Sequence, residues 1–310
     1  MNDMPVDAPP ISPRQASARR LAGRRGPLGV FLRRCGWLVS LKRAVGRWWG
    51  GPANRSALDV LGTFPMYSPN MDGPYRPRAA VTIHAIRRLP AALAELGDIT
   101  GATKCEIIDA ESFCRGAGER ARLLKLVFDR FGSNKANFHN YHFIYAAILK
   151  RAEAIETLLE IGLGTNHADV LSNMGPKGVP GASLRAFRHY LKTATIYGAD
   201  VDRRILFNEE RIRTFFVDQT EWSSLEALGR ELPEAIDIIV DDGLHAHHAN
   251  VQTLRFGLSR VKRGGWVIIE DIRLNSTAIW KVVSALIPAS FKSYLITGEY
   301  GAVFAVQRLE

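Results

Sequence analysis

The sequence predicts an α/β protein built on a doubly wound, mostly parallel sheet, with an antiparallel hairpin at its C-terminal end. Short apolar segments alternate with amphipathic ones between residues 157 and 272, and short connections join them. Such alternation is typical of a parallel sheet covered by helices on both faces. A chain of 310 residues is long enough for one large domain and an extension.

Positive charge is concentrated near the N-terminus. The net charge is +10, and residues 1–55 hold eleven Arg and Lys against two acids. Residues 1–80 are therefore predicted to be a basic, partly disordered extension on a nearly neutral body, a distribution that does not by itself indicate a nucleic-acid partner. Residues 28–49 mix basic and apolar side chains at helical spacing. This segment fits either an amphipathic helix on an anionic membrane surface or an accessory helix docked on its own domain.

Cysteine usage and hydropathy narrow the class of protein. The three cysteines, Cys35, Cys105 and Cys114, form no disulfide or metal pattern, which favours a reducing compartment. The apolar runs are far shorter than the roughly 20 residues of a membrane-spanning helix. We therefore expect a cytoplasmic protein, with residues 28–49 as the candidate for peripheral contact with the inner membrane face. A homo-oligomer is left open.

The elements follow in order along the chain. Residues 81–152 are predicted to be a helical accessory or lid region, with amphipathic patterns at 119–131 and 138–152. Residues 153–310 are predicted to form the main domain, in which Ser183 is a plausible N-cap. Its expected strands are 157–164, 195–201, 212–220, 236–243 and 264–272, its helices 183–191, 223–232 and 248–261, and its closing hairpin 293–308.

Each of the five predicted parallel strands ends in acidic residues. Ligands of open α/β sheets bind beyond the carboxyl ends of the strands. One acid in a loop is uninformative, but five successive strand ends with acids predict a binding site at that edge. The strand ends carry, in order, Glu160 with Gly162 and Gly164, Asp200 with Asp202, Asp218 with Gln219, Asp241 and Asp242 with His245, and Glu270 with Asp271.

The first of these strand ends, "EIGLG", differs from a dinucleotide site. It lacks the third glycine and the immediate helix of that fingerprint, so a pyrophosphate cradle is not expected. Glycines allow a ligand to approach the backbone closely, which suits a ligand with an amino-acid end and a nucleoside end. Asp200 is then placed for ribose hydroxyls, and Asp218 or its neighbour for an adenine amino group. The alternative is that Gly162 and Gly164 only form a tight turn and Asp200 caps a helix.

The last two strand ends predict a metal site. If the two strands are neighbours, about 4.8 Å apart, Asp242 converges with Glu270 and Asp271. Three carboxylates in one site need a cation, and a hard ion such as Mg²⁺ or Ca²⁺ fits oxygen ligands. Such an ion can orient a hydroxyl and lower its pKa, and His245 on the same turn suits a general base. His247 and His248 are expected at the surface or at a helix start, and the spacings of zinc motifs are absent.

The stretch 131–272 resembles the class I S-adenosylmethionine-dependent methyltransferases, and among them the metal-dependent macrolide sugar O-methyltransferases of the macrocin and mycinamicin type. The resemblance is carried by "FGSNKANFHNYHFIY", "LLEIGLG", "GASLRAF", "IYGADV", "RIRTFFVDQT", "IDIIVDDGLH" and "GGWVIIEDI". It implies a Rossmann-like fold, S-adenosyl-L-methionine as methyl donor, and Mg²⁺ or another divalent cation. The chain departs from the family at Asn134 and Leu244, where Asp and Ser are usual, which bears on the lid contacts and local hydrogen bonds.

The resemblance also implies residue roles. His245 would be the general base, and Asp242, Glu270 and Asp271 would bind the metal. The acceptor would be a hydroxylated small molecule, such as a sugar or glycosylated natural product. A catechol or phenol acceptor remains an alternative, as does a non-catalytic binding protein attached to membrane. A nucleic-acid methyltransferase is disfavoured, because "DDGLH" stands where an N-P-P-Y motif would be expected. The donor site would be lined by Glu160, Gly162, Gly164, Ser183, Asp200, Asp218, Gln219 and Asp241.

Overall fold

The structure is a computed structural model and describes residues 75–309. Helix α4 (Tyr75–Ile99) crosses the boundary between two compact units, residues 1–84 and 85–310. The predicted helix 28–49 and most of the predicted extension lie outside the described residues. Within residues 75–309 no helix is long and apolar enough to cross a membrane. The sheet and the candidate site both lie in the second unit.

The second unit is built on a mixed sheet of nine strands in the order β1-β8-β9-β7-β6-β2-β3-β5-β4. All neighbouring strands pair in parallel except at β4 and β9, which run antiparallel to their neighbours. This confirms the mostly parallel, Rossmann-like sheet with a C-terminal hairpin. The strands are β1 (Glu106–Asp109), β2 (Thr157–Ile161), β3 (Thr195–Asp200), β4 (Asn208–Glu209), β5 (Ile212–Phe216), β6 (Ile236–Asp241), β7 (Val261–Ile272), β8 (Phe291–Thr297) and β9 (Ala302–Arg308).

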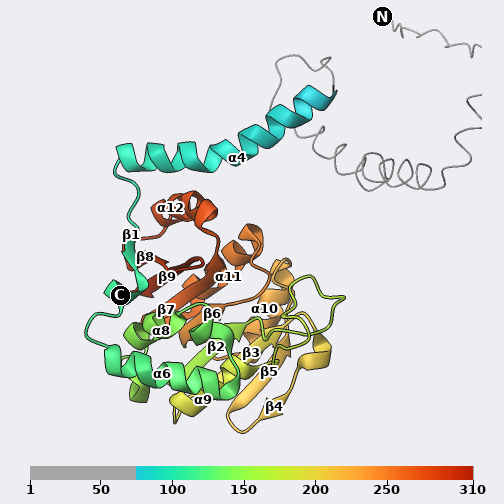
Figure 1. The fold of residues 1–310 in the computed structure, drawn as a ribbon, viewed down its shortest axis with the longest axis vertical. Helices are drawn as coiled ribbons and strands as arrows, with labels where there is room; N and C mark the ends of the chain where they lie inside the picture. The colour runs from blue at the N-terminus through green and yellow to red at the C-terminus, as the bar shows by residue number, and fades with distance from the viewer. Residues whose placement is uncertain (1–74, 310) are drawn as a thin grey trace, which may run out of the picture. The chain divides into compact units, whose positions relative to one another are not determined.

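The order in which successive strands are added to the sheet reverses at β2. The chain runs from β2 outward through β3 to β5, then returns to the other side of β2 for β6 and β7 (Figure 1). Ile161, the last residue of β2, pairs with Ala199 on one side and with Asp241 on the other. The carboxyl ends of β2 and β6 therefore form the switch point at which open α/β sheets bind ligands.

Helices cover both faces of the sheet. Because side chains alternate along a strand, Leu158 and Leu159 of β2 enter different hydrophobic cores. The first core holds α6, α8 and α9, drawn green to yellow, and the second holds α10, α11 and α12, drawn in orange tones (Figure 1). The helices are α5 (Ala110–Phe113), α6 (Gly118–Phe131), α7 (Asn134–Asn137), α8 (Tyr141–Ile148), α9 (Ala182–Tyr190), α10 (Trp222–Glu231), α11 (His247–Arg260) and α12 (Thr277–Ala285), with 3-10 turns at Ala152–Ala154, Arg203–Ile205 and Leu274–Ser276.

The structure differs from the sequence predictions in several places. Strand β1 and helix α12 were not predicted, and α8 ends at Ile148 rather than near Ala152. Helices α6 and α8 of the predicted accessory region share a core with the sheet. The prediction of Ser183 as an N-cap is wrong. Gly181 caps α9, and the hydroxyl of Ser183 donates to the carboxylate of Glu160 instead.

The turn after β2 passes very close to the turn after β6. Gly162 has a φ of 100°, and a Cβ atom built there would overlap the carbonyl oxygen of Asp242. The amide of Asp242 donates to the carbonyl of Ile161 at 2.8 Å, which holds the two turns together. Only glycine provides both the positive φ and the space that this approach requires.

Gly162→Ala should destabilise the fold far more than the same substitution at a control glycine. The control needs a positive φ as well, but free space where the new Cβ would lie. Gly116 is the matched control, because its φ is 81° and a Cβ there would meet nothing within 4 Å. We expect Gly116→Ala to cost about 1 kcal/mol, from the left-handed conformation alone. Gly162→Ala should cost at least about 3 kcal/mol, because backbone must also move. Urea unfolding of the two variants measures both values, and equal losses would contradict the close approach.

Candidate active site

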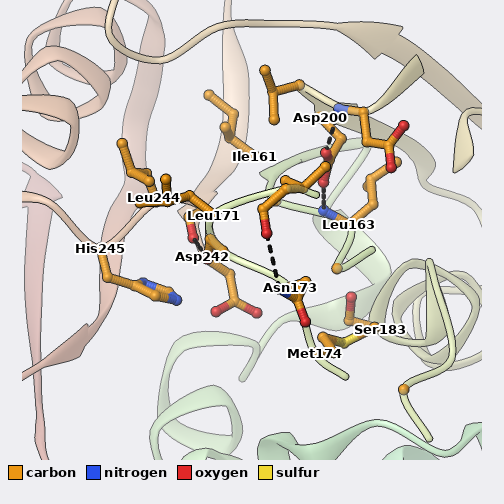
Figure 2. A pocket seen from close by; sticks show the side chains of 18 of the residues that line it. Ile161, Leu163, Leu171, Asn173, Met174, Ser183, Asp200, Asp242, Leu244 and His245 are labelled. Atoms are coloured by element: carbon orange, nitrogen blue, oxygen red, sulfur yellow. Dashed lines mark hydrogen bonds between the residues drawn. The ribbon is translucent and has the colours of Figure 1, made fainter. Parts of the chain in front are cut away.

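A cavity of about 920 Å³ opens at the carboxyl ends of β2, β3, β5, β6 and β7. Figure 2 shows the Asp242 carboxylate and the His245 imidazole pointing toward the same space, with Asp200 beside Leu163 at the other end. Nine of the twelve predicted site residues line this cavity: Gly162, Gly164, Ser183, Asp200, Asp218, Gln219, Asp242, His245 and Asp271. The other three, Glu160, Asp241 and Glu270, do not line it and are fully buried.

Asp200 holds the shape of the glycine turn. Its carboxylate accepts hydrogen bonds from the amide of Leu163 at 2.7 Å and from the amide of Asp202 at 2.8 Å. Burial raises the pKa of the Asp200 carboxyl, and the hydrogen bonds from these amides oppose that rise. Asp200 is thus a wall of the cavity and a support of the turn at once. Its predicted contact with ribose hydroxyls stays a prediction.

Asp241 and Gln219 support the turn that carries Asp242 and His245. The Gln219 amide group donates to Asp241 at 2.8 Å and accepts from the amide of Leu244 at 2.8 Å. Asp241 also accepts from the side chain of Asn250 at 3.1 Å. Burial raises the pKa of the Asp241 carboxyl, while these donors lower it. Both residues were predicted to bind the donor, and the structure shows them tied into the protein.

Lys135 was not predicted as a site residue, yet it lies at the centre of the site's charged groups. It lies in the short helix α7, its side chain is 1% exposed, and its ammonium contacts three carboxylates. The ammonium lies 3.1 Å from Glu160 and 2.7 Å from Asp242, and it also contacts Glu270. Burial alone lowers the pKa of a lysine. Here the attraction of Asp242, Glu270 and Glu160 outweighs burial and raises the pKa of Lys135 well above its ordinary value.

Two hydroxyl groups complete this buried cluster. The Ser183 hydroxyl donates to Glu160, and the Tyr145 hydroxyl donates to Glu270. Burial is the main cause of the raised pKa of both carboxyls, and Lys135 opposes it. Glu270 therefore has one oxygen on Lys135 and the other on Tyr145. The predicted convergence of the acids of β6 and β7 is confirmed, because Lys135 bridges Asp242 and Glu270.

The side of the cluster that faces the cavity offers metal ligands. Asp242, His245 and Asp271 each present a ligand atom, and these atoms lie within 4.8 Å of one another. The Asp271 carboxylate accepts from the Tyr141 hydroxyl at 2.6 Å and lies 3.3 Å from the His139 ring. Asp271 also lies 3.5 Å from Nε2 of His245.

The charges around the cavity fit a divalent cation. Four carboxyl groups gather here, those of Glu160, Asp242, Glu270 and Asp271, and the Lys135 ammonium contacts all of them except Asp271. Like charges at this range resist ionising together unless positive charge is added, and carboxylate oxygens are the ligands that Mg²⁺ prefers. Of the predicted metal ligands, Asp242 and Asp271 face the cavity, whereas Glu270 lies behind them and has both oxygens in use.

Two of the cavity residues have strained backbones. His245 and Asp271 each have a φ of 56°, in the left-handed region that non-glycine residues seldom adopt. Such strain is typical of functional sites, where the surrounding structure imposes it. In addition, Nδ1 of His245 is buried and has no hydrogen-bond partner among the described residues. His247 begins α11 and His248 is exposed, as the sequence predicted.

Comparisons with known proteins agree with the resemblance found in the sequence. No family model matches the chain. The chain is 30% identical over 156 residues to 8-demethyl-8-α-L-rhamnosyl tetracenomycin-C 2'-O-methyltransferase of Streptomyces olivaceus, covering 49% of this chain and 37% of that protein. It is 32% identical over 100 residues to demethylmacrocin O-methyltransferase of Streptomyces fradiae, covering 32% and 24%. It is 36% identical over 101 residues to mycinamicin VI 2''-O-methyltransferase of Micromonospora griseorubida, again covering 32% and 24%.

The matches cover only part of each protein. The chain spans well under half the length of these curated relatives. A solved methyltransferase of the mycinamycin biosynthetic pathway, in complex with Mg and SAH, superposes with a TM-score of 0.49 and 21% identity, covering 60% of this chain and 53% of that one. The curated relatives confirm the similarity to sugar O-methyltransferases that the sequence indicated.

The strain at His245 predicts an unusual order of stability. His245→Gly should be more stable than His245→Ala by about 1 kcal/mol, because only glycine adopts a φ of 56° without cost. At an ordinary helical position the order is reversed, because glycine is about 1 kcal/mol worse than alanine there. Ala121, buried in α6, is one such position for comparison. Thermal unfolding of the two His245 variants gives the answer, and a more stable alanine variant would show that the backbone relaxes.

Proposed function

We propose that this chain is an S-adenosylmethionine-dependent O-methyltransferase that methylates a hydroxyl of a sugar or a glycosylated natural product, with Mg²⁺ or another divalent cation as helper. The observation that carries the proposal is that one cavity joins two groups of residues. The glycine turn with Asp200 and Asp218 lies at one end of it, and Asp242, His245 and Asp271 lie at the other. The names of the relatives support the reaction, since all three are O-methyltransferases.

The donor is proposed to lie along the glycine turn. A bound S-adenosylmethionine supplies an activated methyl group, and the protein must align it with the incoming hydroxyl. Gly162 and Gly164 line the cavity where the donor would lie, with Ser183, Asp218 and Asp200 around it. Asp241 and Glu160 act indirectly in this proposal, by holding Gln219 and Ser183 in place.

The acceptor hydroxyl is proposed to be activated at the other end. Asp242 and Asp271 would hold the divalent cation, which lowers the pKa of a hydroxyl that it binds. Glu270 is the predicted third ligand, and to join them it must exchange a contact with Lys135 or Tyr145 for the ion. Two adjacent hydroxyls of a sugar could share such an ion, and a catechol offers the same geometry.

His245 is proposed as the general base that takes the proton from the acceptor. Its ring lines the cavity beside Asp242 and Asp271, so a hydroxyl held there lies within reach of Nε2. Histidine is well suited to this task near neutral pH. The hydrogen bond from Tyr141 keeps Asp271 in position next to the base.

Isothermal titration is the first test of the proposed ligands. We expect micromolar binding of S-adenosylmethionine and saturable binding of Mg²⁺ to the purified chain. Asp242→Asn should weaken Mg²⁺ binding at least about ten-fold, because it removes a carboxylate that faces the cavity. Glu231→Gln, at an exposed acid at the end of α10, is the matched control and should change nothing. Absence of donor binding under every condition would overturn the proposed enzyme.

His245→Gln should slow methyl transfer by roughly 10² to 10⁴-fold, the usual contribution of a general base. His248→Gln is the control, because His248 lies three residues away and is exposed. Initial rates are measured with rhamnosides, other glycosides and catechols as acceptors, and the Kd of the donor is measured for each variant. A loss below ten-fold with an unchanged donor Kd would remove His245 from the role of base. A preference for catechols would favour the alternative acceptor class.

A further inference from the structure

We propose that Lys135 is a resident cation that competes with the divalent ion for Asp242 and Glu270, and that it thereby sets the ion affinity of the site. The inference rests on the proposed metal-assisted function and adds a means of control to the same site. It follows from the position of one ammonium among the carboxylates predicted to bind the ion.

Lys135 is too deeply buried to be a surface lysine turned inward by chance. Its side chain is 1% exposed, and lysine is almost never fully buried unless it is paired. Every ionic contact found for its ammonium is to an acid of this cluster, namely Glu160, Asp242 or Glu270. The site therefore contains a positive charge of its own before any ion arrives.

Two of these three acids are also predicted metal ligands. Lys135 contacts Oδ2 of Asp242 at 2.7 Å and one oxygen of Glu270. An ammonium and a divalent ion on the same carboxylates repel each other, and the repulsion is strong where water is excluded. Binding of the ion to these acids must therefore weaken or displace the contacts of Lys135.

The third acid gives the ammonium a place to remain. Glu160 lies 3.1 Å from the Lys135 ammonium, is fully buried and does not line the cavity. Its other partner is the Ser183 hydroxyl, on the donor side of the site. Lys135 can thus stay paired with Glu160 while an ion takes Asp242 and Glu270. In the absence of the ion, the same ammonium holds these two acids close together.

The test compares ion affinity with and without this charge. Lys135→Met keeps much of the side-chain length and removes the ammonium. Removal of a unit charge at this range should tighten binding of Mg²⁺, or of Mn²⁺ as a second probe, at least ten-fold by isothermal titration. Lys150→Met, at an exposed lysine just after α8, is the control and should leave the ion Kd unchanged.

A second pair of variants covers the risk that Lys135→Met does not fold. Lys135→Met combined with Glu160→Gln removes one positive and one negative charge and keeps Asp242, Glu270 and Asp271. Its reference is Glu160→Gln alone, and circular dichroism verifies that each variant is folded. Tighter ion binding in the double variant than in this reference, by at least ten-fold, is again expected. The same result counts in favour if the reference shows no saturable binding and the double variant does.

The remaining outcomes distinguish failure of the proposed competition from failure of the proposed metal-assisted function. An ion Kd that is unchanged or weaker without Lys135 would overturn the competition and leave the metal site itself standing. No saturable ion binding in the wild type and in any variant would overturn both the competition and the metal-assisted part of the proposed function. Donor binding measured in the same titrations distinguishes that case from a protein that binds neither ligand.

Discussion

The contacts of the Lys135 ammonium with three buried carboxylates hold the candidate site together. They join α7 to the carboxyl ends of β2, β6 and β7, four segments that are far apart in the sequence. Burial of such charges is costly, and it is tolerated only when the geometry and additional hydrogen bonds compensate. Ser183 and Tyr145 provide those hydrogen bonds. Loss of one partner from a buried pair typically costs 3–5 kcal/mol, so these four segments can hardly move independently.

Glycines in the turns after β2 and β6 allow the backbone to pack as closely as the buried charged cluster requires. Gly162 lets the turn after β2 lie against the backbone of Asp242, and Gly243 leaves space for the Gln219 side chain. Gln219 then bonds both Asp241 and the amide of Leu244. The hydrogen bonds of the buried Gln219 and Asp241 side chains therefore fix the conformation of the "DDGLH" segment. This explains how His245 can keep a φ of 56° that it would rarely adopt alone.

Much of the fold was predictable because its signals are local. Each apolar strand between 157 and 272 lies between turn residues, and these five strands were placed within a few residues of their observed bounds. Strand β1 was missed because it has four residues, three of them exposed, so its pattern is not that of a buried strand. It exists because it pairs with β8, nearly two hundred residues later. Contacts of this kind leave no periodic signal in a short segment.

The sequence predicted the part of the site that lies at the carboxyl ends of the strands. Nine of the twelve proposed residues meet around one cavity, because the carboxyl ends of parallel strands share an edge. The prediction failed to place Lys135, whose sequence "GSNKAN" is that of an ordinary polar loop or short helix. Its partners lie 25, 107 and 135 residues further on. The sequence predicted that the clustered carboxylates need a cation. One such cation is the ammonium of Lys135, which belongs to the protein itself.

The balance of charge in the cluster also bears on the kind of ligand that the cavity favours. Lys135 brings one ammonium to this cluster, in which burial raises the pKa of Glu160 and of Glu270. The carboxylates of Asp242 and Asp271 at the cavity still outnumber that one positive charge. A second built-in cation would neutralise more of that excess and would oppose both a metal ion and a positively charged donor. With Lys135 alone, the wall attracts cationic ligands while its acids still stay together. A sulfonium donor and a divalent ion are both positive, so a partly neutralised acidic wall serves the proposed methyl transfer better than a fully neutralised one.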